Sequence, residues 1–316
     1  MNLCVTDIGD IPVAGPVESY GSGAVRSCSP VGRCVLSTEA GELVPQYSTD
    51  DLRRKTVQAI HFHENGNVRS LSLEEKTPVF TPAGIIPAEM ITFYKSGHVK
   101  RVFPLNGKLS GYWAQEDEEA LATPIALDTP AGPISVKLIS ICFYESGDLR
   151  SVTLWPGEIV TVGTPAGSLK VRTGMSFRQD GSLISVEPAV PVQVKTPAGT
   201  VTCYDPDAVG IHGDTNSLVF DCSGNVTRLV TTLTSITATH YSGRKAAFIP
   251  ESRDSLCGDG DKEMVPMLVS FEAGGMTIQS NPKIAGVYID FDEYEVRTDP
   301  FLPQLGNMLG GLKCSV

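Results

Sequence analysis

The sequence predicts an all-β protein, a repetitive antiparallel β-hairpin meander, and three observations indicate it. An apolar-x-Phe-x-x-x-Gly-x-apolar pattern recurs along the chain, and a second pattern, Thr-x-Ala-Gly, follows most copies of it. In five copies the glycine of the second pattern lies 18 to 20 residues after the glycine of the first. Such steps hold two strands and their turns but no helix of ordinary length.

The first pattern has the features of a hairpin with a three-residue loop. Its copies are Val17/Ser19/Gly23/Val25, which lacks the Phe, then Ile60/Phe62/Gly66/Val68, Ile91/Phe93/Gly97/Val99, Ile141/Phe143/Gly147/Leu149, Met175/Phe177/Gly181/Leu183 and Leu218/Phe220/Gly224/Val226. A small polar residue precedes five of the glycines, as suits a tight turn. We expect the glycine to close the loop in the left-handed region of backbone conformation. In the copy with Gly97, the loop is then residues 95–97, and Phe93 faces Val99 across the hairpin.

The return strand of each hairpin is expected to carry a bulge. Apolar residues follow the turn glycine at the second and fifth places, as Val68 and Leu71 follow Gly66. This step breaks the two-residue period of a strand, so we predict one extra residue there.

Thr-x-Ala-Gly predicts a second, tighter turn. Its copies are Thr38–Gly41, Thr81–Gly84, Thr129–Gly132, Thr164–Gly167 and Thr196–Gly199, with His240–Gly243 as a decayed version. Proline at the second place and glycine at the fourth are preferences of a type I turn.

The hairpin array is expected over residues 1–245, with six copies and an insertion near 104–120; residues 246–316 are expected to form a degenerate repeat and a C-terminal cap. Within the array, 48–56 is interpreted as a charged connector or a single helical turn. In the cap we expect a loop over 250–262, a seventh copy of the first pattern at Val269/Phe271/Gly275 and a last strand at Val287/Ile289/Phe291. The tail from 302 to 316 is expected to fray or dock loosely.

Two architectures fit such an array. One is an open curved sheet or β-solenoid, and the other is a six- or seven-bladed β-propeller. The shortest unit, from Gly66 to Gly97, is tight for a four-stranded blade. The sequence therefore favours the open repeat.

Composition restricts the partners. The chain has 25 basic and 36 acidic residues and a net charge of −11, so we expect no nucleic acid and no anionic membrane as partner, with the basic clusters 53–55 and Lys100-Arg101 as local exceptions. No signal peptide and no membrane span is evident, so a cytoplasmic location is expected.

The eight cysteines are expected to be reduced thiols in such a compartment. A bridge between Cys28 and Cys34 is the alternative. Cys142 and Cys222 stand beside the pattern's Phe and are interpreted as packing residues.

No arrangement of residues defines an active site. His61 and His63 share a strand face at a spacing that suits a metal, yet a third ligand is not evident, so exposed histidines are the preferred interpretation. Asp259 and Asp261 are interpreted as loop residues instead of calcium ligands. Asp205, Asp207 and Asp214 indicate either a polar pocket or a surface loop. We therefore assign no catalytic, cofactor-binding or metal residue and expect no cofactor.

The segment Phe-Tyr-Glu-Ser-Gly-Asp-Leu-Arg-Ser-Val at 143–152 resembles the hairpins of MORN-type repeats, in the bacterial variant with an aromatic residue before the turn. The resemblance spans about residues 17–245, and it implies protein association or scaffolding without catalysis. The leading hypothesis is thus a non-catalytic protein-binding repeat module. The rival is a hydrolase or carbohydrate-acting enzyme with an acidic site between repeats, for which Glu116 and Asp117 are candidates. Exposed aromatics on one face, namely Tyr94, Tyr112, Trp113 and Tyr144, would favour binding.

Overall fold

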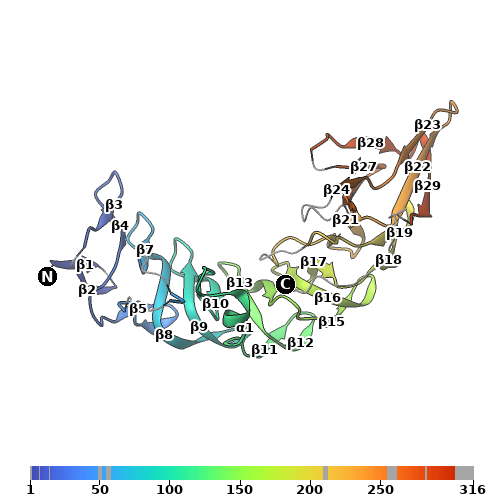
Figure 1. Cartoon of the computed structure of the whole chain (residues 1–316). Helices are drawn as coiled ribbons and strands as arrows, with labels where there is room; N and C mark the ends of the chain where they lie inside the picture. The colour runs from blue at the N-terminus through green and yellow to red at the C-terminus, as the bar shows by residue number, and fades with distance from the viewer. Residues whose placement is uncertain are drawn as a thin grey trace. The chain divides into compact units, whose positions relative to one another are not determined.

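The structure is a computed structural model, and it describes residues 2–6, 8–13, 15–48, 52–54, 58–208, 213–254, 262–281 and 283–302. It is almost entirely β, and α1 (Gln115–Glu119) is the one α-helix of these residues (Figure 1). Contacts divide the chain into two compact units. Unit 1 comprises Met1–Val160, Thr173–Ser182 and Ile211–Asp214; unit 2 comprises Thr161–Arg172, Leu183–Gly210 and Thr215–Val316.

Unit 1 is built on one open antiparallel sheet. In spatial order its strands are β3 (Glu18–Ser19), β4 (Val25–Cys28), β7 (Ile60–Phe62), β8 (Val68–Thr81), β9 (Gly84–Phe93), β10 (Val99–Phe103), β13 (Leu138–Phe143), β14 (Leu149–Leu154) and the end of β16 (Gly167–Phe177). Strands that follow one another in the chain pair with one another, and the order does not divide into blades. The all-β meander is confirmed, in its open form.

Shorter two-stranded arms lie between these hairpins. In unit 1 they are β1 (Asn2–Thr6) with β2 (Gly9–Val13), β5 (Leu36–Thr38) with β6 (Gly41–Leu43), and β11 (Ile125–Thr129) with β12 (Gly132–Val136). The Thr-x-Ala-Gly turns close the arms β5–β6 and β11–β12 and also join β8 to β9. In the last of these, Thr81 pairs with Gly84, whose carbonyl accepts a hydrogen bond from the threonine hydroxyl at 2.7 Å. The predicted second turn is confirmed.

Unit 2 has a sheet of β17 (Leu183–Pro188), β20 (Leu218–Phe220), β21 (Val226–Thr231), β26 (Met267–Glu272), β27 (Gly275–Gln279) and β28 (Val287–Asp290). Its remaining strands are β15 (Val160–Thr164), β18 (Val192–Thr196) with β19 (Gly199–Cys203), β22 (Thr234–His240) with β23 (Lys245–Phe248) and β29 (Tyr294–Pro300), and β24 (Ser252–Asp254) with β25 (Lys262–Met264). Three pairings, β21 with β26, β22 with β23 and β22 with β29, cross residue 245.

Three expectations for the C-terminal part were wrong. The hairpin β26–β27 has Glu272 opposite Gly275, so its loop is the two residues Ala273 and Gly274 and not the three-residue loop of the first pattern. The strand at 287–290 is not the last, because β29 follows it. The expected loop over 250–262 contains β24 and the start of β25, which pair through residues such as Arg253 and Glu263.

The three-residue loop and the bulge were predicted correctly. Phe93 pairs with Val99, the Tyr94 amide donates to the His98 carbonyl at 2.8 Å, and Gly97 has a φ of 102°. The register then shifts between Val99 and Arg101, which leaves Lys100 as the extra residue. The same shift leaves Arg26, Arg69, Arg150 and Thr227 as the extra residues of their hairpins.

The core lies under the other face of these strands. The pattern's Phe62, Phe143, Phe177 and Phe220 are each at most 2% exposed. The rings of Phe62, Phe143 and Phe220 lie opposite the apolar residue two places after the turn glycine, as Phe143 lies opposite Leu149. The constant spacing within the pattern therefore produces a row of buried rings.

The insertion of unit 1 is attached by a buried ion-pair cluster. Arg53 lies 2.6 Å from both Glu89 and Glu118, and Trp113 donates its indole N–H to Glu118 at 2.7 Å. A Cβ on Gly107 would lie 2.0 Å from a Glu118 oxygen, so the loop passes directly over the carboxylate. Within the predicted connector over 48–56, Arg53 is therefore buried, at 8% exposed.

Candidate binding groove

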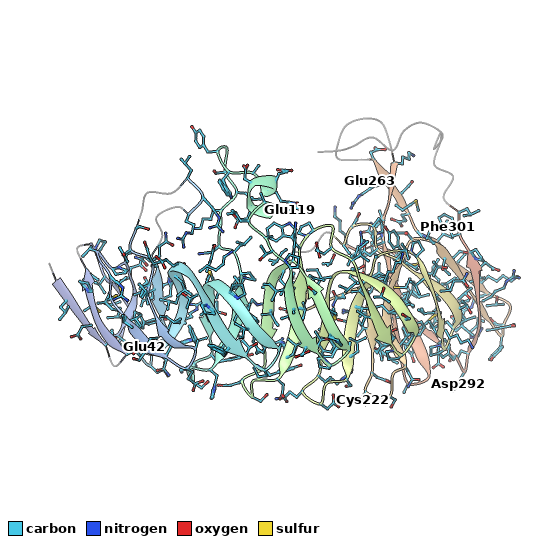
Figure 2. The ribbon with its side chains drawn as sticks, turned by 90° about the horizontal axis from the view of Figure 1, so that it is seen from below. Glu42, Glu119, Cys222, Glu263, Asp292 and Phe301 are labelled. Atoms are coloured by element: carbon cyan, nitrogen blue, oxygen red, sulfur yellow. The ribbon has the colours of Figure 1, made fainter. Side chains whose placement is uncertain are left out.

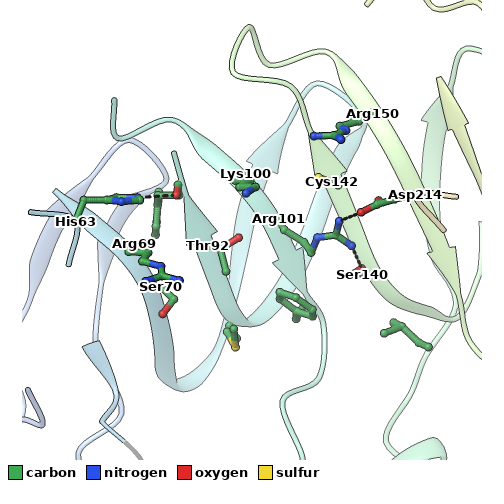
Figure 3. Close-up of a pocket in the computed structure, with 14 residues that line it drawn as sticks. His63, Arg69, Ser70, Thr92, Lys100, Arg101, Ser140, Cys142, Arg150 and Asp214 are labelled. Carbon is green, nitrogen blue, oxygen red and sulfur yellow. Dashed lines mark hydrogen bonds and ion pairs between the residues drawn. The ribbon is translucent and has the colours of Figure 1, made fainter. Parts of the chain in front are cut away.

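A groove of about 740 Å³ lies over the polar face of the sheet in unit 1 (Figure 3). Strands β8, β9, β10, β13 and β14 form its floor, and Asp214 lies at one side. Its lining residues are His63, Arg69, Ser70, Met90, Thr92, Phe93, Lys100, Arg101, Phe103, Ile139, Ser140, Cys142, Arg150 and Asp214. A smaller hollow of about 330 Å³, which holds Arg26 and His61, shares Arg69 and Ser70 with it.

The floor is polar because side chains alternate along each strand. Ile91 and Val102 are fully buried, and the residues beside them, Thr92 and Arg101, take the opposite face. Across the sheet these residues stand directly opposite one another in the order Ser70, Thr92, Arg101, Cys142, Ser151 and Ser176. Hydroxyl groups thus dominate a line that crosses the strands.

Four cations stand beside this line, one at each bulge of unit 1, and we call Arg26, Arg69, Lys100 and Arg150 the cation row. They lie on β4, β8, β10 and β14, which are two strands apart at each step. All four are exposed, and none takes part in an ion pair with the part of the chain that the structure describes. Figure 3 shows Lys100 between Arg69 and Arg150.

Arg101 is different, because a carboxylate neutralises it. Its guanidinium donates to Asp214 at 2.5 Å and to the Ser140 hydroxyl at 3.0 Å, and Ser151 also donates to Asp214. Burial opposes ionisation of Asp214, but the Ser151 hydrogen bond and the charge of Arg101 outweigh it and hold the pKa of Asp214 below its ordinary value. Arg101 and Asp214 therefore organise the groove without adding net charge.

In the first four copies of the pattern, the residue after the Phe position ties neighbouring hairpins together. Tyr20, Tyr94 and Tyr144 donate their hydroxyls to the carbonyls of Phe62, Phe143 and Phe177 at 2.8, 2.9 and 2.9 Å. His63 holds the equivalent place, with its Nε2 atom 3.1 Å from the Phe93 carbonyl.

Two of these tyrosines also support the cation row. Lys100 lies 5.4 Å from the ring centre of Tyr94, and Arg150 lies 5.6 Å from that of Tyr144, which is within cation–π range. The four aromatics noted in the sequence do not form the exposed face that would favour binding. Tyr94, Tyr144 and Trp113 are partly buried and hydrogen-bonded, and of the four only Tyr112 stands fully in solvent, at 82% exposed.

The histidines and carboxylates noted in the sequence do not converge on one centre. His61 is partly buried, and burial together with the charge of Arg69 lowers its pKa. Among the described residues, no group of three His, Cys, Asp or Glu side chains is arranged to hold a metal ion. Asp207 pairs with Arg253 at 2.9 Å, and Asp205 belongs with it to unit 2. His212, Asp259 and Asp261 lie outside the described residues.

Of the two cysteines interpreted as packing residues, one is buried and the other is exposed. Cys4, Cys28, Cys34, Cys142, Cys203 and Cys222 are free thiols. Cys142 is 1% exposed, and burial raises its pKa, as expected for a packing residue. Cys222 is exposed at the hairpin turn (Figure 2), so its interpretation as a packing residue was wrong. Cys257 and Cys314 lie outside the described residues.

Unit 2 contains a second cluster of polar side chains. Glu187 is 2% exposed, and one of its oxygens accepts from the Ser217 amide at 2.8 Å, whereas the other has no hydrogen-bond partner among the described residues. Burial, helped by the charge of Asp205, raises the pKa of Glu187 to about 7. Burial also raises the pKa of Asp205.

The cation row has a signal in the sequence that runs of basic residues do not show. The third residue after the turn glycine is basic in the first four hairpins and is Ile184 or Thr227 in the next two. The signal therefore lies in the position within the repeated pattern.

Comparisons with protein-family models, curated proteins and solved structures find no match for the chain. No helix of the described residues has the length and apolar character that crossing a membrane requires.

Proposed function

We propose that this protein is a non-catalytic repeat module that binds an acidic segment of a partner protein along the cation row, in the cytoplasm. The observation that carries the proposal is the row itself. Four exposed cations without ion-pair partners among the described residues stand at equivalent positions of successive hairpins, in a chain whose net charge is −11.

An unneutralised row of one sign in an acidic protein favours a ligand of opposite sign. Complementary potentials steer such a ligand and fix its register more than they add affinity. The hydroxyls of Ser70 and Thr92 line the groove and offer hydrogen bonds next to the charges. Met90, Phe103 and Ile139 offer apolar contacts. The resemblance to MORN-type hairpins and the six free thiols agree with a cytoplasmic binding role.

The rival function, a hydrolase or carbohydrate-acting enzyme, would require two carboxyls that face one opening. Glu187 and Asp205 have raised pKa values, yet Glu187 is 2% exposed and does not reach solvent. Asp117 accepts a hydrogen bond from the Ala114 amide at the start of α1, and Glu116 is exposed beside it. The groove therefore supports binding better than hydrolysis.

The experiment is a fluorescence-anisotropy titration of the full chain with a flexible labelled peptide of alternating Glu and Ser. The triple variant Arg69→Gln/Lys100→Gln/Arg150→Gln is expected to bind about tenfold more weakly, because three exposed ion pairs are lost. Binding by the wild type is expected to weaken with added salt.

The matched control is Lys170→Gln/Lys195→Gln/Lys245→Gln, which removes three exposed lysines of unit 2. The control is expected to bind like the wild type. Equal weakening in both triple variants, or no binding by the wild type, would contradict the proposal.

A further inference from the structure

The spacing of the cation row adds a specific constraint on the ligand. Neighbouring strands of a sheet lie about 4.8 Å apart. Successive cations of the row stand two strands apart, so their attachment points repeat about every 9.6 Å across the sheet.

An extended β-strand does not match this repeat. It rises about 3.3 Å per residue and alternates its faces, so residues on one face repeat about every 6.6 Å. Polyproline II has three residues per turn and rises about 3.1 Å per residue, so every third side chain lies on one face about every 9.3 Å. The polyproline II repeat agrees with the repeat of the cation row.

From this agreement we infer that the groove binds an acidic polypeptide in the polyproline II conformation, with Asp or Glu at every third position. The inference rests on the proposed function and names its ligand class. Each acidic side chain meets one cation of the row, and the residues between them lie on the groove floor.

The side chains around the cations suit such a ligand. Lys100 lies over the ring of Tyr94, and Arg150 lies over the ring of Tyr144, so each ring supports one cation of the row. The hydroxyls of both tyrosines are fixed on backbone carbonyls, so the rings and the cations over them are held in place before a ligand arrives. Preorganised contacts of this kind reduce the entropic cost of binding.

A single-stranded nucleic acid is the competing polyanion. It carries more charge per length than a peptide with one carboxylate in three residues, and the net charge of −11 repels it more strongly. We therefore argue for the peptide and include the nucleic acid in the test.

The test compares two labelled peptides that have the same composition, one with Glu-Pro-Pro repeated four times and the other with four Glu followed by eight Pro. The periodic peptide is expected to bind the full chain about fivefold more tightly than the block peptide, because more of its carboxylates reach a cation at once. Lys100→Gln, in the middle of the row, is expected to weaken the periodic peptide about two- to fivefold.

The two peptides could bind the wild type with equal affinity, and both could lose binding in the Arg69→Gln/Lys100→Gln/Arg150→Gln variant. That result would overturn the inference and leave the proposed function standing. Tighter binding of a twelve-nucleotide oligothymidylate than of the periodic peptide would also overturn it. Binding that the triple variant does not change would overturn the inference and the proposed function together.

Discussion

At the scale of single residues, the pattern's phenylalanines carry the core of the array. Phe143 is 2% exposed, whereas Phe80, in the same unit, is 77% exposed. The two rings therefore allow the same substitution to be compared inside and outside the core.

Phe143→Ala is expected to lower the free energy of unfolding by about 3 to 5 kcal/mol, because it removes a buried ring and leaves a cavity. Phe80→Ala is expected to change it by no more than about 0.5 kcal/mol. Urea denaturation followed by circular dichroism measures both. Similar losses in the two variants would remove Phe143 from the core.

Glu187 predicts a pH dependence of stability. In the folded chain its pKa is about 7, against an ordinary value of 4.5, because the buried carboxyl favours its neutral form. The folded protein keeps this proton between these pH values while the unfolded chain has released it, so stability falls as pH rises through that window. The fall amounts to about 3 kcal/mol from this one group.

Glu187→Gln is expected to remove this contribution, since an amide does not ionise. Denaturant melts at several pH values between about 4 and 8 test it. The stability of the variant relative to the wild type should increase with pH up to about 7. A difference that stays constant across the window would show that Glu187 does not titrate as a buried acid.

At the scale of elements, each hairpin depends on a glycine with positive φ. Gly147 has a φ of 93°, and a Cβ there would meet only Pro82, at 4.0 Å, so the backbone and not crowding makes glycine necessary. Gly147→Ala is expected to cost about 1 to 2 kcal/mol. Gly21, at the tip of the first hairpin, has no positive φ and nothing within 4 Å, and Gly21→Ala is the control.

The measurement is the thermal midpoint of both variants. Gly147→Ala should melt several degrees below the wild type, whereas Gly21→Ala should melt at the same temperature as the wild type. If the two variants melt together, the left-handed turn is not required for the hairpin.

The hairpins were predictable because their causes are local. The Phe-to-Gly spacing fixed the pairing of Phe93 with Val99, and the break in apolar period predicted the bulge at Lys100. The ion pairs of Arg53 with Glu89 and Glu118 were not predictable, because 36 and 65 residues separate the partners in the chain. The groove was not predictable for the same reason, since the Asp214 that binds Arg101 lies 113 residues away in the chain. Strand β29 pairs with β22 through tertiary contacts and carries no copy of either pattern.

At the scale of the whole molecule, neither unit is a continuous stretch of chain. Thr173–Ser182 and Ile211–Asp214 belong to unit 1 although they follow Thr161 of unit 2. The predicted division at residue 245 also separates β21 from β26 and β22 from β29.

A chain that ends at Val160 is therefore expected to lose the pairing of β14 with β16 and the carboxylate of Asp214. The unpaired edge of β14 should make it prone to association, and its unfolding midpoint should fall. Size-exclusion chromatography and a urea melt check this. A monomeric fragment with the midpoint of the full chain would show that residues 1–160 fold alone.

The central claim is that the residues at the hairpin bulges form one line with a repeat of two strands. Pulsed electron paramagnetic resonance tests it with spin labels at Arg69→Cys/Arg150→Cys and at Arg26→Cys/Arg150→Cys, with Cys222, Cys257 and Cys314 replaced by Ser. The label pairs stand four and six strands apart, so distances of about 19 and 29 Å are expected. Two distances that do not differ by about 10 Å would contradict the line, and with it the matching of an acidic ligand to the row.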